Sequence, residues 1–181
     1  MLQIRKALLT DIPAILDLIN RYAVLGVMLP RTEFEMAENI RDFIVAFDEG
    51  RLAGCGALHF YTATSGEVRS LAVDPTMKTK GIGRALVEAL EAEAREQDLY
   101  SLFAFTYVPG FFGKLGFEEV DRGELPLKAW KDCLRCPKFQ ACDEIAVLKR
   151  LRSDALPSAV LRLTQIADFP HLPVVSKPAR E

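Results

Sequence analysis

The middle of the chain carries two glycines and three cations directly behind a strand-like run. That run, Leu71-Ala72-Val73, ends at Asp74-Pro75, and the segment Lys78-Thr79-Lys80-Gly81-Ile82-Gly83-Arg84 follows where an amphipathic helix begins. The first backbone N–H groups of a helix have no partners within the helix, and the helix dipole adds positive charge at the same place. These residue types in this order predict a site for the phosphates of a small molecule.

The spacing excludes two common phosphate-binding motifs. A P-loop requires G-x4-G-K-[ST], and the sequence contains no such run. A dinucleotide-binding fingerprint requires a small residue at position 86, where this chain has Leu86. It also requires an acidic residue about 20 positions further along, and the segment Leu99-Tyr100-Ser101 contains no acidic residue. The alternative to a phosphate site is a plain strand–turn–helix connection whose glycines serve only tight packing.

Two separate motifs resemble those of the GCN5-related N-acetyltransferases (GNAT). The first is Leu71-Ala72-Val73-Asp74-Pro75-x-x-Lys78-x-x-Gly81-Ile82-Gly83-x-x-Leu86, similar to the family's acetyl-CoA motif Q/R-x-x-G-x-G/A with Lys78 in place of Gln or Arg. The second is Phe111-Phe112-Gly113-Lys114-Leu115-Gly116-Phe117, which resembles the signature F-Y-x-K-x-G-F. The resemblance covers about residues 3–150.

This resemblance implies a single-domain α/β fold with a mixed, mostly antiparallel sheet, flanked by helices and splayed at the acetyl-CoA site. It implies that Lys78 and the amides from Thr79 to Arg84 hold the pyrophosphate of acetyl-CoA, with Phe112 also at the cofactor. It further implies that Leu71, Ala72 and Val73 pair with the pantetheine arm, and that one amide of this strand polarises the thioester carbonyl. The acceptor amine then attacks directly in a ternary complex.

A narrower resemblance is to the short bacterial N-acetylglutamate synthases. It rests on the segment from Gly26 to Thr32, on Thr106-Tyr107-x-Pro109-x-Phe111-Phe112, and on the run 124–144 with Trp130 and its cysteines. It implies acetylation of the α-amine of L-glutamate or L-glutamine, the first step of arginine biosynthesis. Two alternatives stay open: a GNAT enzyme for a protein amine, polyamine or xenobiotic, and a non-catalytic acetyl-CoA-binding regulatory module.

Glutamate acetylation needs a base for the α-ammonium and cations for the carboxylates. Glu67 opens the strand that carries the polarising amide and matches a carboxylate of the glutamate synthases, so we expect it to be the base, directly or through a water. A solvent-facing glutamate is the alternative. Arg31, Arg69 and Lys128 are the expected substrate ligands, of which Arg31 matches a substrate-carboxylate arginine of the family. The competing interpretation of Arg31 is an ordinary surface arginine, and that of Arg69 is an ion pair with Glu67.

The departing thiolate also needs a proton. Many family members have a tyrosine where this chain has Phe112, and phenylalanine cannot donate one. Thr106 and Tyr107 offer hydroxyl groups just upstream, and the ordinary pKa of tyrosine, about 10, suits protonation of a thiolate. Both are therefore candidate catalytic residues.

Periodicity and capping signals predict the elements that position these residues. Thr10-Asp11 marks the start of one helix, and Thr32 with Glu35 forms a capping box for another. The helix behind the glycines has Ala85, Leu86, Ala89 and Leu90 on its inner face. We expect helices over 11–23, 82–97 and 109–115, and strands over 2–7, 43–47, 52–60, 67–73, 102–106, 117–120 and 143–151.

The 181 residues suit one domain over 1–152, followed by a Pro-rich C-terminal arm over 153–181 that is partly ordered or packed on the domain or a dimer partner. The net charge of -2 argues against a nucleic-acid partner. No apolar run approaches the roughly 20 residues that span a bilayer, and a signal-peptide pattern is absent from the N-terminal residues. We expect a cytoplasmic homodimer acting on a small amino acid, without a membrane partner.

The cysteines do not predict a metal site. Cys133, Cys136 and Cys142 form a C-x2-C-x5-C pattern, but the sequence offers no second C-x2-C and no nearby histidine as a fourth ligand. Zinc, a disulfide or neither are the alternatives for this cluster. Cys55 lies in an apolar run and is expected to be a small buried hydrophobic residue.

Overall fold

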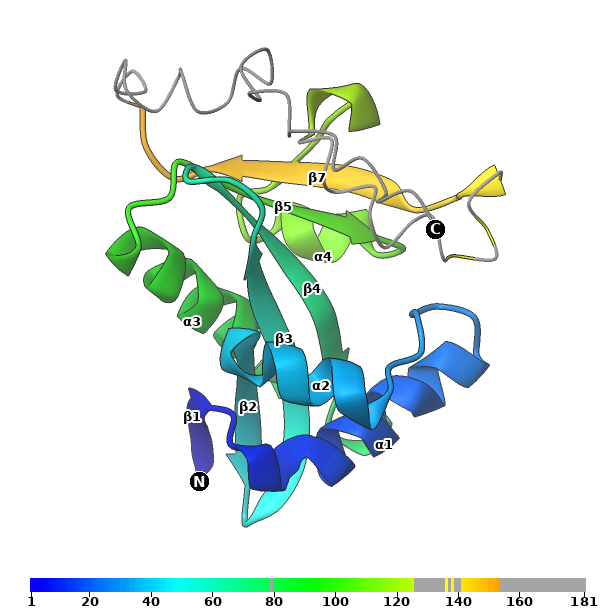
Figure 1. Cartoon of the computed structure of the whole chain (residues 1–181). Helices are drawn as coiled ribbons and strands as arrows, with labels where there is room; N and C mark the ends of the chain where they lie inside the picture. The colour runs from blue at the N-terminus through cyan, green and yellow to red at the C-terminus, as the bar shows by residue number, and fades with distance from the viewer. Residues whose placement is uncertain (79, 126–135, 137, 139–140, 154–181) are drawn as a thin grey trace, which may run out of the picture.

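A seven-stranded sheet in the order β1-β2-β3-β4-β5-β7-β6 is the frame of the computed structural model (Figure 1), which describes residues 1–78, 80–125, 136, 138 and 141–153. All neighbouring strands run antiparallel except β4 and β5, which are parallel, and this confirms the predicted mixed, mostly antiparallel sheet. The strands are β1 (Leu2–Lys6), β2 (Phe43–Asp48), β3 (Arg51–Phe60), β4 (Ser65–Val73), β5 (Ser101–Thr106), β6 (Glu118–Glu119) and β7 (Ile145–Arg150).

Helices cover both faces of this sheet (Figure 1). One apolar core lies between the sheet and α1 and α2, and contains Ile15, Leu18 and Phe43. A second core, with Leu86 and Leu90, lies under α3 and α4 on the opposite face. The helices are α1 (Ile12–Val24), α2 (Glu33–Asn39), α3 (Ile82–Glu96) and α4 (Pro109–Gly113), with the 3-10 turns η1 (Leu9–Asp11), η2 (Ile40–Asp42), η3 (Pro75–Met77) and η4 (Arg122–Glu124). Among the described residues, no helix has the length and apolar character needed to cross a membrane.

The two helices on the first face begin in different ways. Thr32 Oγ1 accepts a hydrogen bond from the Glu35 N–H (3.2 Å), and the Glu35 carboxylate accepts one from the Thr32 N–H (2.9 Å), so the predicted capping box is present. Asp11 stands at the N-cap position of α1, as predicted, but its side chain does not bond to the helix. Its carboxylate instead accepts from the Leu8 N–H (2.8 Å) and from both terminal nitrogens of Arg5 (2.7 and 2.9 Å). A buried carboxylate gains more from a bidentate arginine than from a single amide.

The elements found in the structure follow the predicted series, with shifts at their ends. The inner face of α3 buries Leu86 and Leu90 as expected, and Ala89 packs against the core while partly exposed. Val87 and Ala94 are also buried, whereas Ala85 is only partly buried. The strand predicted over 117–120 is only two residues long, and the one predicted over 143–151 begins at 145. End residues are the least constrained part of a periodic pattern, because they make the fewest ladder or helix bonds.

The centre of the sheet opens between β4 and β5. These strands pair from Ser65 and Ser101 only as far as Glu67 and Phe103, although β4 continues to Val73 and β5 to Thr106. Beyond that point β5 stays with β7 and the two strands diverge (Figure 1), as predicted for a sheet splayed at this site. Past Glu67, β4 therefore has a backbone edge that does not bond to β5.

A bulge shapes the same stretch of β4. Cys55 of β3 pairs with Ala72, whereas Ala57 pairs with Arg69, so β4 has one residue more than β3 between these pairs. Ser70 within the bulge takes a left-handed conformation at φ 52°. Because a bulge bends its strand and increases the local twist, it turns the end of β4 away from β5.

Candidate functional site

The start of α3 leaves its first backbone amides without a partner within the helix. Gly81 stands at the N-cap with φ 77°, a conformation in which a side chain is strained, and its carbonyl accepts the first intrahelical bond from the Ala85 N–H (3.0 Å). The amides of Ile82, Gly83 and Arg84 precede that bond and so have no partner within the helix. Thr79 lies outside the described residues.

Within the part of the chain that the structure describes, the cations beside these amides make weak contacts near the surface. Lys80 Nζ lies 3.4 Å from the Asp48 carboxylate, and Arg84 lies 3.6 Å from Glu88 one turn along α3. Lys78 Nζ lies 5.4 Å from the centroid of the Tyr22 ring. Exposed pairs of this kind are weak in water, so these cations can turn toward an anionic ligand at little cost.

Asp74 ends β4 and starts the loop toward α3. Its N–H donates to the Ala53 carbonyl (2.8 Å), while its carboxylate accepts from the Thr76 N–H (2.9 Å) and hydroxyl (2.7 Å). These bonds from Thr76 lower the pKa of Asp74, with Arg21 assisting. The Asp-Pro pair therefore fixes the direction in which the chain leaves the strand.

The first turn of α3 meets the end of β4 and the start of α4 at Gly83. A Cβ atom at this position would lie 3.4 Å from the Phe111 ring and 3.6 Å from the Val73 side chain. Both distances are ordinary van der Waals contacts, so the amide-bearing turn lies directly beside both elements. Loop, strand end and α4 converge here, so a single elongated ligand can contact all three.

The end of β4 is held from the other face by Tyr22 of α1. Because the Asp74 N–H points to β3, the peptide groups of Val73 point to the opposite side, along the diverging edge. The Tyr22 hydroxyl donates a 2.6 Å hydrogen bond to the Val73 carbonyl. Sequence reasoning missed this contact, because Tyr22 looks like one more member of the apolar stripe of its helix.

Glu67 lies at the point where β4 and β5 separate, and only 9% of it is exposed. Arg69, two residues on, lies on the same face of the strand. The Arg69 guanidinium reaches the Asn39 side chain (3.2 Å) and the Asp42 carboxylate (3.4 Å) at the end of α2 and in η2. Its charge is therefore engaged by acidic and amide groups of the protein itself.

A histidine that sequence reasoning did not single out belongs to the same cluster. His59 of β3 has its Nδ1 atom 2.6 Å from the Asp42 carboxylate, and it is the direct partner of Glu67 in the β3–β4 register. No local pattern predicts the pair of His59 and Asp42, because these residues lie 17 positions apart and meet only when η2 folds against the sheet.

The loop between α1 and α2 holds Arg31 by its backbone. The Asn20 side chain accepts from the Arg31 N–H (2.9 Å) and donates to its carbonyl (3.0 Å). The Arg31 residue is half-buried. Its position is thus fixed by α1 rather than left to a freely moving loop. Lys128, the third expected carboxylate ligand, lies outside the described residues.

The two candidate proton donors stand at the end of β5. Tyr107 donates a hydrogen bond to Asp143 (2.9 Å) and accepts one from Lys138 (3.1 Å). Partial burial raises the pKa of Tyr107, an effect that the Lys138 bond opposes and the Asp143 carboxylate reinforces. Thr106 is buried, and its hydroxyl oxygen accepts from the Val108 N–H (3.0 Å), which leaves its proton available for another acceptor.

Phe112 packs into the core under α4. Its ring makes edge contacts with Phe111 and Phe117, each at 5.2 Å between centroids. Only 4% of Phe112 is exposed, whereas its neighbour Phe111 is the ring that approaches Gly83.

The cysteines form no recognisable metal centre where the chain is described. Cys136 and Cys142 are free and partly exposed, while Cys133 lies outside the described residues. The described part of the chain contains no group of three or more His, Cys, Asp or Glu side chains that could hold a metal ion. Cys55 is fully buried, and burial raises the pKa of its thiol to about 12.

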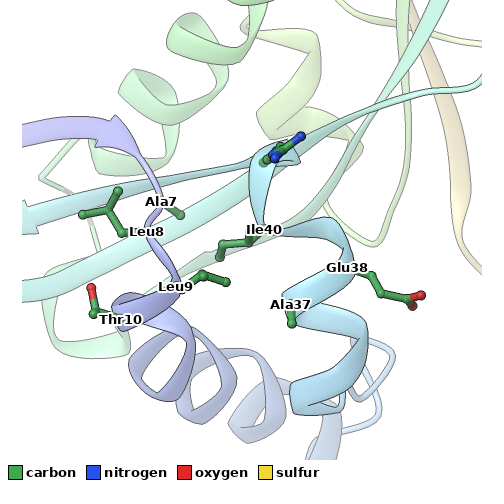
Figure 2. Close-up of a pocket in the computed structure, with 8 residues that line it drawn as sticks. Ala7, Leu8, Leu9, Thr10, Ala37, Glu38 and Ile40 are labelled. Carbon is green, nitrogen blue, oxygen red and sulfur yellow. The ribbon is translucent and has the colours of Figure 1, made fainter.

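A pocket of about 630 Å³ lies elsewhere, between η1 and the end of α2 (Figure 2). Leu8 and Leu9 form one wall, and Ala37 and Ile40 form the other. None of the residues that line it belongs to the predicted site. This pocket is therefore separate from the predicted site at the end of β4 and the start of α3.

Comparisons with known proteins agree with this geometry. The sequence model of the acetyltransferase (GNAT) family matches residues 12–117. An uncharacterized N-acetyltransferase of Chlorobaculum tepidum is 45% identical over 148 residues, which are 82% of this chain and 96% of that protein. An amino-acid acetyltransferase of Mycobacterium tuberculosis is 37% identical over 121 residues, covering 65% of this chain and 69% of the relative.

A solved structure extends the likeness to three dimensions. The N-acetylglutamate synthase of Neisseria gonorrhoeae, complexed with coenzyme A and N-acetyl-glutamate, superposes with a TM-score of 0.77 at 30% identity. The match covers 84% of this chain but 36% of that protein, so this chain spans about a third of the longer synthase. With its splayed sheet, its glycine-bearing helix start and a family match over more than half its length, the chain belongs to the GNAT acetyltransferase family.

Proposed function

We propose that this protein transfers the acetyl group of acetyl-CoA to the α-amine of L-glutamate or L-glutamine, and that it does so as a cytoplasmic homodimer at the first step of arginine biosynthesis. The observation that carries the proposal is the closeness of the end of β4, whose edge past Glu67 does not bond to β5, to the amides at the start of α3. The similarity to amino-acid acetyltransferases supports the acceptor class, and the coenzyme A in the related synthase structure supports the donor.

The residues between the end of β4 and the start of α3 fit the shape and charge of coenzyme A. The amides of Ile82, Gly83 and Arg84 suit a pyrophosphate, with Lys78 and Lys80 as nearby cations. The lack of a side chain at Gly83 leaves the space that a Cβ atom would occupy against Phe111. An extended pantetheine arm matches the backbone edge of β4 as an added strand would.

Glu67 then acts as the general base. It removes a proton from the acceptor ammonium, directly or through a water, and the free amine attacks the thioester carbonyl. Amides at the bulge of β4 stabilise the negative charge that develops on the carbonyl oxygen, because they are already aligned before the reaction. Arg31, whose backbone is fixed by Asn20, and Lys128 pair with the carboxylates of the acceptor.

Tyr107 is the proposed donor to the departing thiolate. Its raised pKa keeps the phenol protonated near neutral pH, which a general acid requires. Thr106 contributes a second hydroxyl at the end of β5. Asp143 and Lys138 orient the phenol before the reaction.

The test is an acceptor screen that measures free coenzyme A by chromatography. We expect turnover with glutamate or glutamine, and Glu67→Gln should lower kcat by about 10²- to 10⁴-fold, the usual contribution of a general base. Glu49→Gln, an exposed carboxylate in the β2–β3 hairpin, is the matched control and should keep full activity.

Three results would contradict the proposal in distinguishable ways. Faster turnover of lysine peptides, polyamines or other amines than of glutamate would assign a different acceptor. Tight binding of acetyl-CoA without turnover of any amine would indicate a regulatory module. Full activity of Glu67→Gln would remove Glu67 from the mechanism.

A further inference from the structure

We propose that His59, held by Asp42, carries to solvent the proton that Glu67 takes from the acceptor amine. The inference rests on the proposed acetyl transfer and adds a residue to it that neither the motifs nor the family resemblance identifies. In this scheme Glu67 is the base that touches the substrate, and His59 acts through Glu67.

The stoichiometry of the reaction requires such an outlet. An α-amine enters as an ammonium ion and leaves as a neutral amide, and the leaving thiolate takes up one proton, so each turnover releases one net proton to solvent. That proton first rests on Glu67, whose carboxylate must lose it before the next cycle. Because only 9% of Glu67 is exposed, bulk water has little direct access to this group.

His59 stands beside Glu67 on the same face of the sheet. The two residues are direct partners in the antiparallel β3–β4 ladder. Directly opposed side chains in such a ladder have their Cβ atoms about 5 Å apart, a distance that the two side chains or one water can bridge. About a quarter of the His59 side chain is exposed (26%), so the imidazole connects the buried carboxylate to solvent.

The contacts of His59 fix its tautomer in the form that a proton carrier needs. Its Nδ1 atom lies 2.6 Å from the Asp42 carboxylate, so Nδ1 carries the hydrogen and donates it, since two lone pairs at this distance would repel each other. Arg69 Nη2 also lies near Nδ1, at 3.1 Å, but donates to Asp42 and Asn39 instead. The neutral ring therefore has its lone pair on Nε2.

The transfer then proceeds as follows. The O–H bond on Glu67 breaks and an N–H bond forms at His59 Nε2, which yields an imidazolium ion. The proton then leaves Nε2 for water, which restores the neutral ring with its Nδ1–H on the Asp42 carboxylate. The Tyr61 ring packs edge-on against the imidazole (5.0 Å between centroids) and holds its plane.

The decisive variant is His59→Asn. The asparagine side-chain amide can still donate to Asp42 from nearly the position of Nδ1, so the local structure is kept, but no nitrogen remains that can accept a proton. We expect kcat with the acceptor amino acid to fall about 10- to 100-fold, within the usual range for acid–base groups. The acceptor KM should stay unchanged, because His59 acts through Glu67 and does not touch the substrate.

His59→Ala provides a chemical rescue that a purely structural role would not produce. Added imidazole should restore part of its kcat, by about five-fold or more, because a free imidazole can occupy the vacated space and carry the proton. His171→Ala, which removes the other histidine of the chain, is the matched control and should show neither the loss nor the rescue.

Each outcome bears on one proposal or the other. Full kcat in His59→Asn, or no rescue of His59→Ala by imidazole, would overturn the proton outlet while the acetyl-transfer proposal stands. If the wild-type protein acetylates another amine better than glutamate, the same variants measured with that amine decide the role of His59. If the protein acetylates no amine, both proposals are wrong.

Discussion

The substitution Gly81→Ala tests whether the left-handed conformation at the start of α3 serves coenzyme A. Gly81 has φ 77°, and a Cβ atom there would meet no other atom within 4 Å, so the change introduces backbone strain without a steric clash. A left-handed conformation costs a residue with a Cβ atom about 1–2 kcal/mol. In the free protein the loop can relax to escape this strain. Binding of the pyrophosphate must restore the original conformation, and the complex therefore bears the cost.

The chain offers a matched control at Gly50 in the β2–β3 hairpin. Gly50 has the same φ of 77°, and a Cβ atom there would likewise meet no atom within 4 Å, but it lies in a turn without a proposed ligand. Gly50→Ala should lower the Tm by about 2–8 °C, the shift expected for 1–2 kcal/mol in a chain of this length, whereas Gly81→Ala should lower it less, because its loop relaxes in the free protein. Only Gly81→Ala should weaken coenzyme A binding, by about 5- to 30-fold in Kd by titration calorimetry. Equal Kd values for the two variants would refute the role of Gly81.

Three further predictions concern stability and reactivity. Asp11→Ala should lower the free energy of unfolding in urea by about 2 kcal/mol, because it leaves Arg5 without its buried partner. Asp17→Ala, whose ion pair is exposed, should lower it by less than about 0.5 kcal/mol. Burial alone would raise the pKa of Glu91, but hydrogen bonds from Lys149 and Arg95 lower it overall. A group with a lowered pKa stabilises the fold only while it is ionised, so Glu91→Gln should lower the Tm at pH 7. The difference in Tm from the wild type should vanish as the pH falls below the ordinary pKa range of glutamate. A difference in Tm that stays constant at all pH values would exclude the ion pair as its source. Cys55 should resist alkylation at pH 8 in the native state while Cys142 reacts, as peptide mapping can show, and rapid labelling of Cys55 would contradict its burial.

The elements with strong local signals are the ones that sequence reasoning predicts well. The helix expected over 82–97 ends one residue earlier, and Thr32 and Glu35 form the expected capping box. Gly81 and Gly83 also stand where the motif places them, at the first turn of that helix. Each of these features depends on residues within one or two turns of each other, so the sequence carries the whole signal.

Features that depend on distant partners were not predictable in the same way. The bulge at Ser70 has no local cue, because serine is not a typical left-handed residue and the extra position exists only relative to the pairing of β3. Asp11 looks like a helix cap, but Arg5 competes for its carboxylate after folding. The Asp42–His59 pair and the bond from Tyr22 to Val73 likewise join elements that the sheet brings together.

A crystal structure of the protein with coenzyme A would decide whether the start of α3 is the phosphate site. We expect pyrophosphate oxygens about 3 Å from the amide nitrogens between Gly81 and Arg84. We expect the pantetheine arm to lie along the edge of β4 past Glu67, where β4 does not bond to β5. A pyrophosphate bound at any other surface, with these amides bonded to the protein itself, would contradict this assignment.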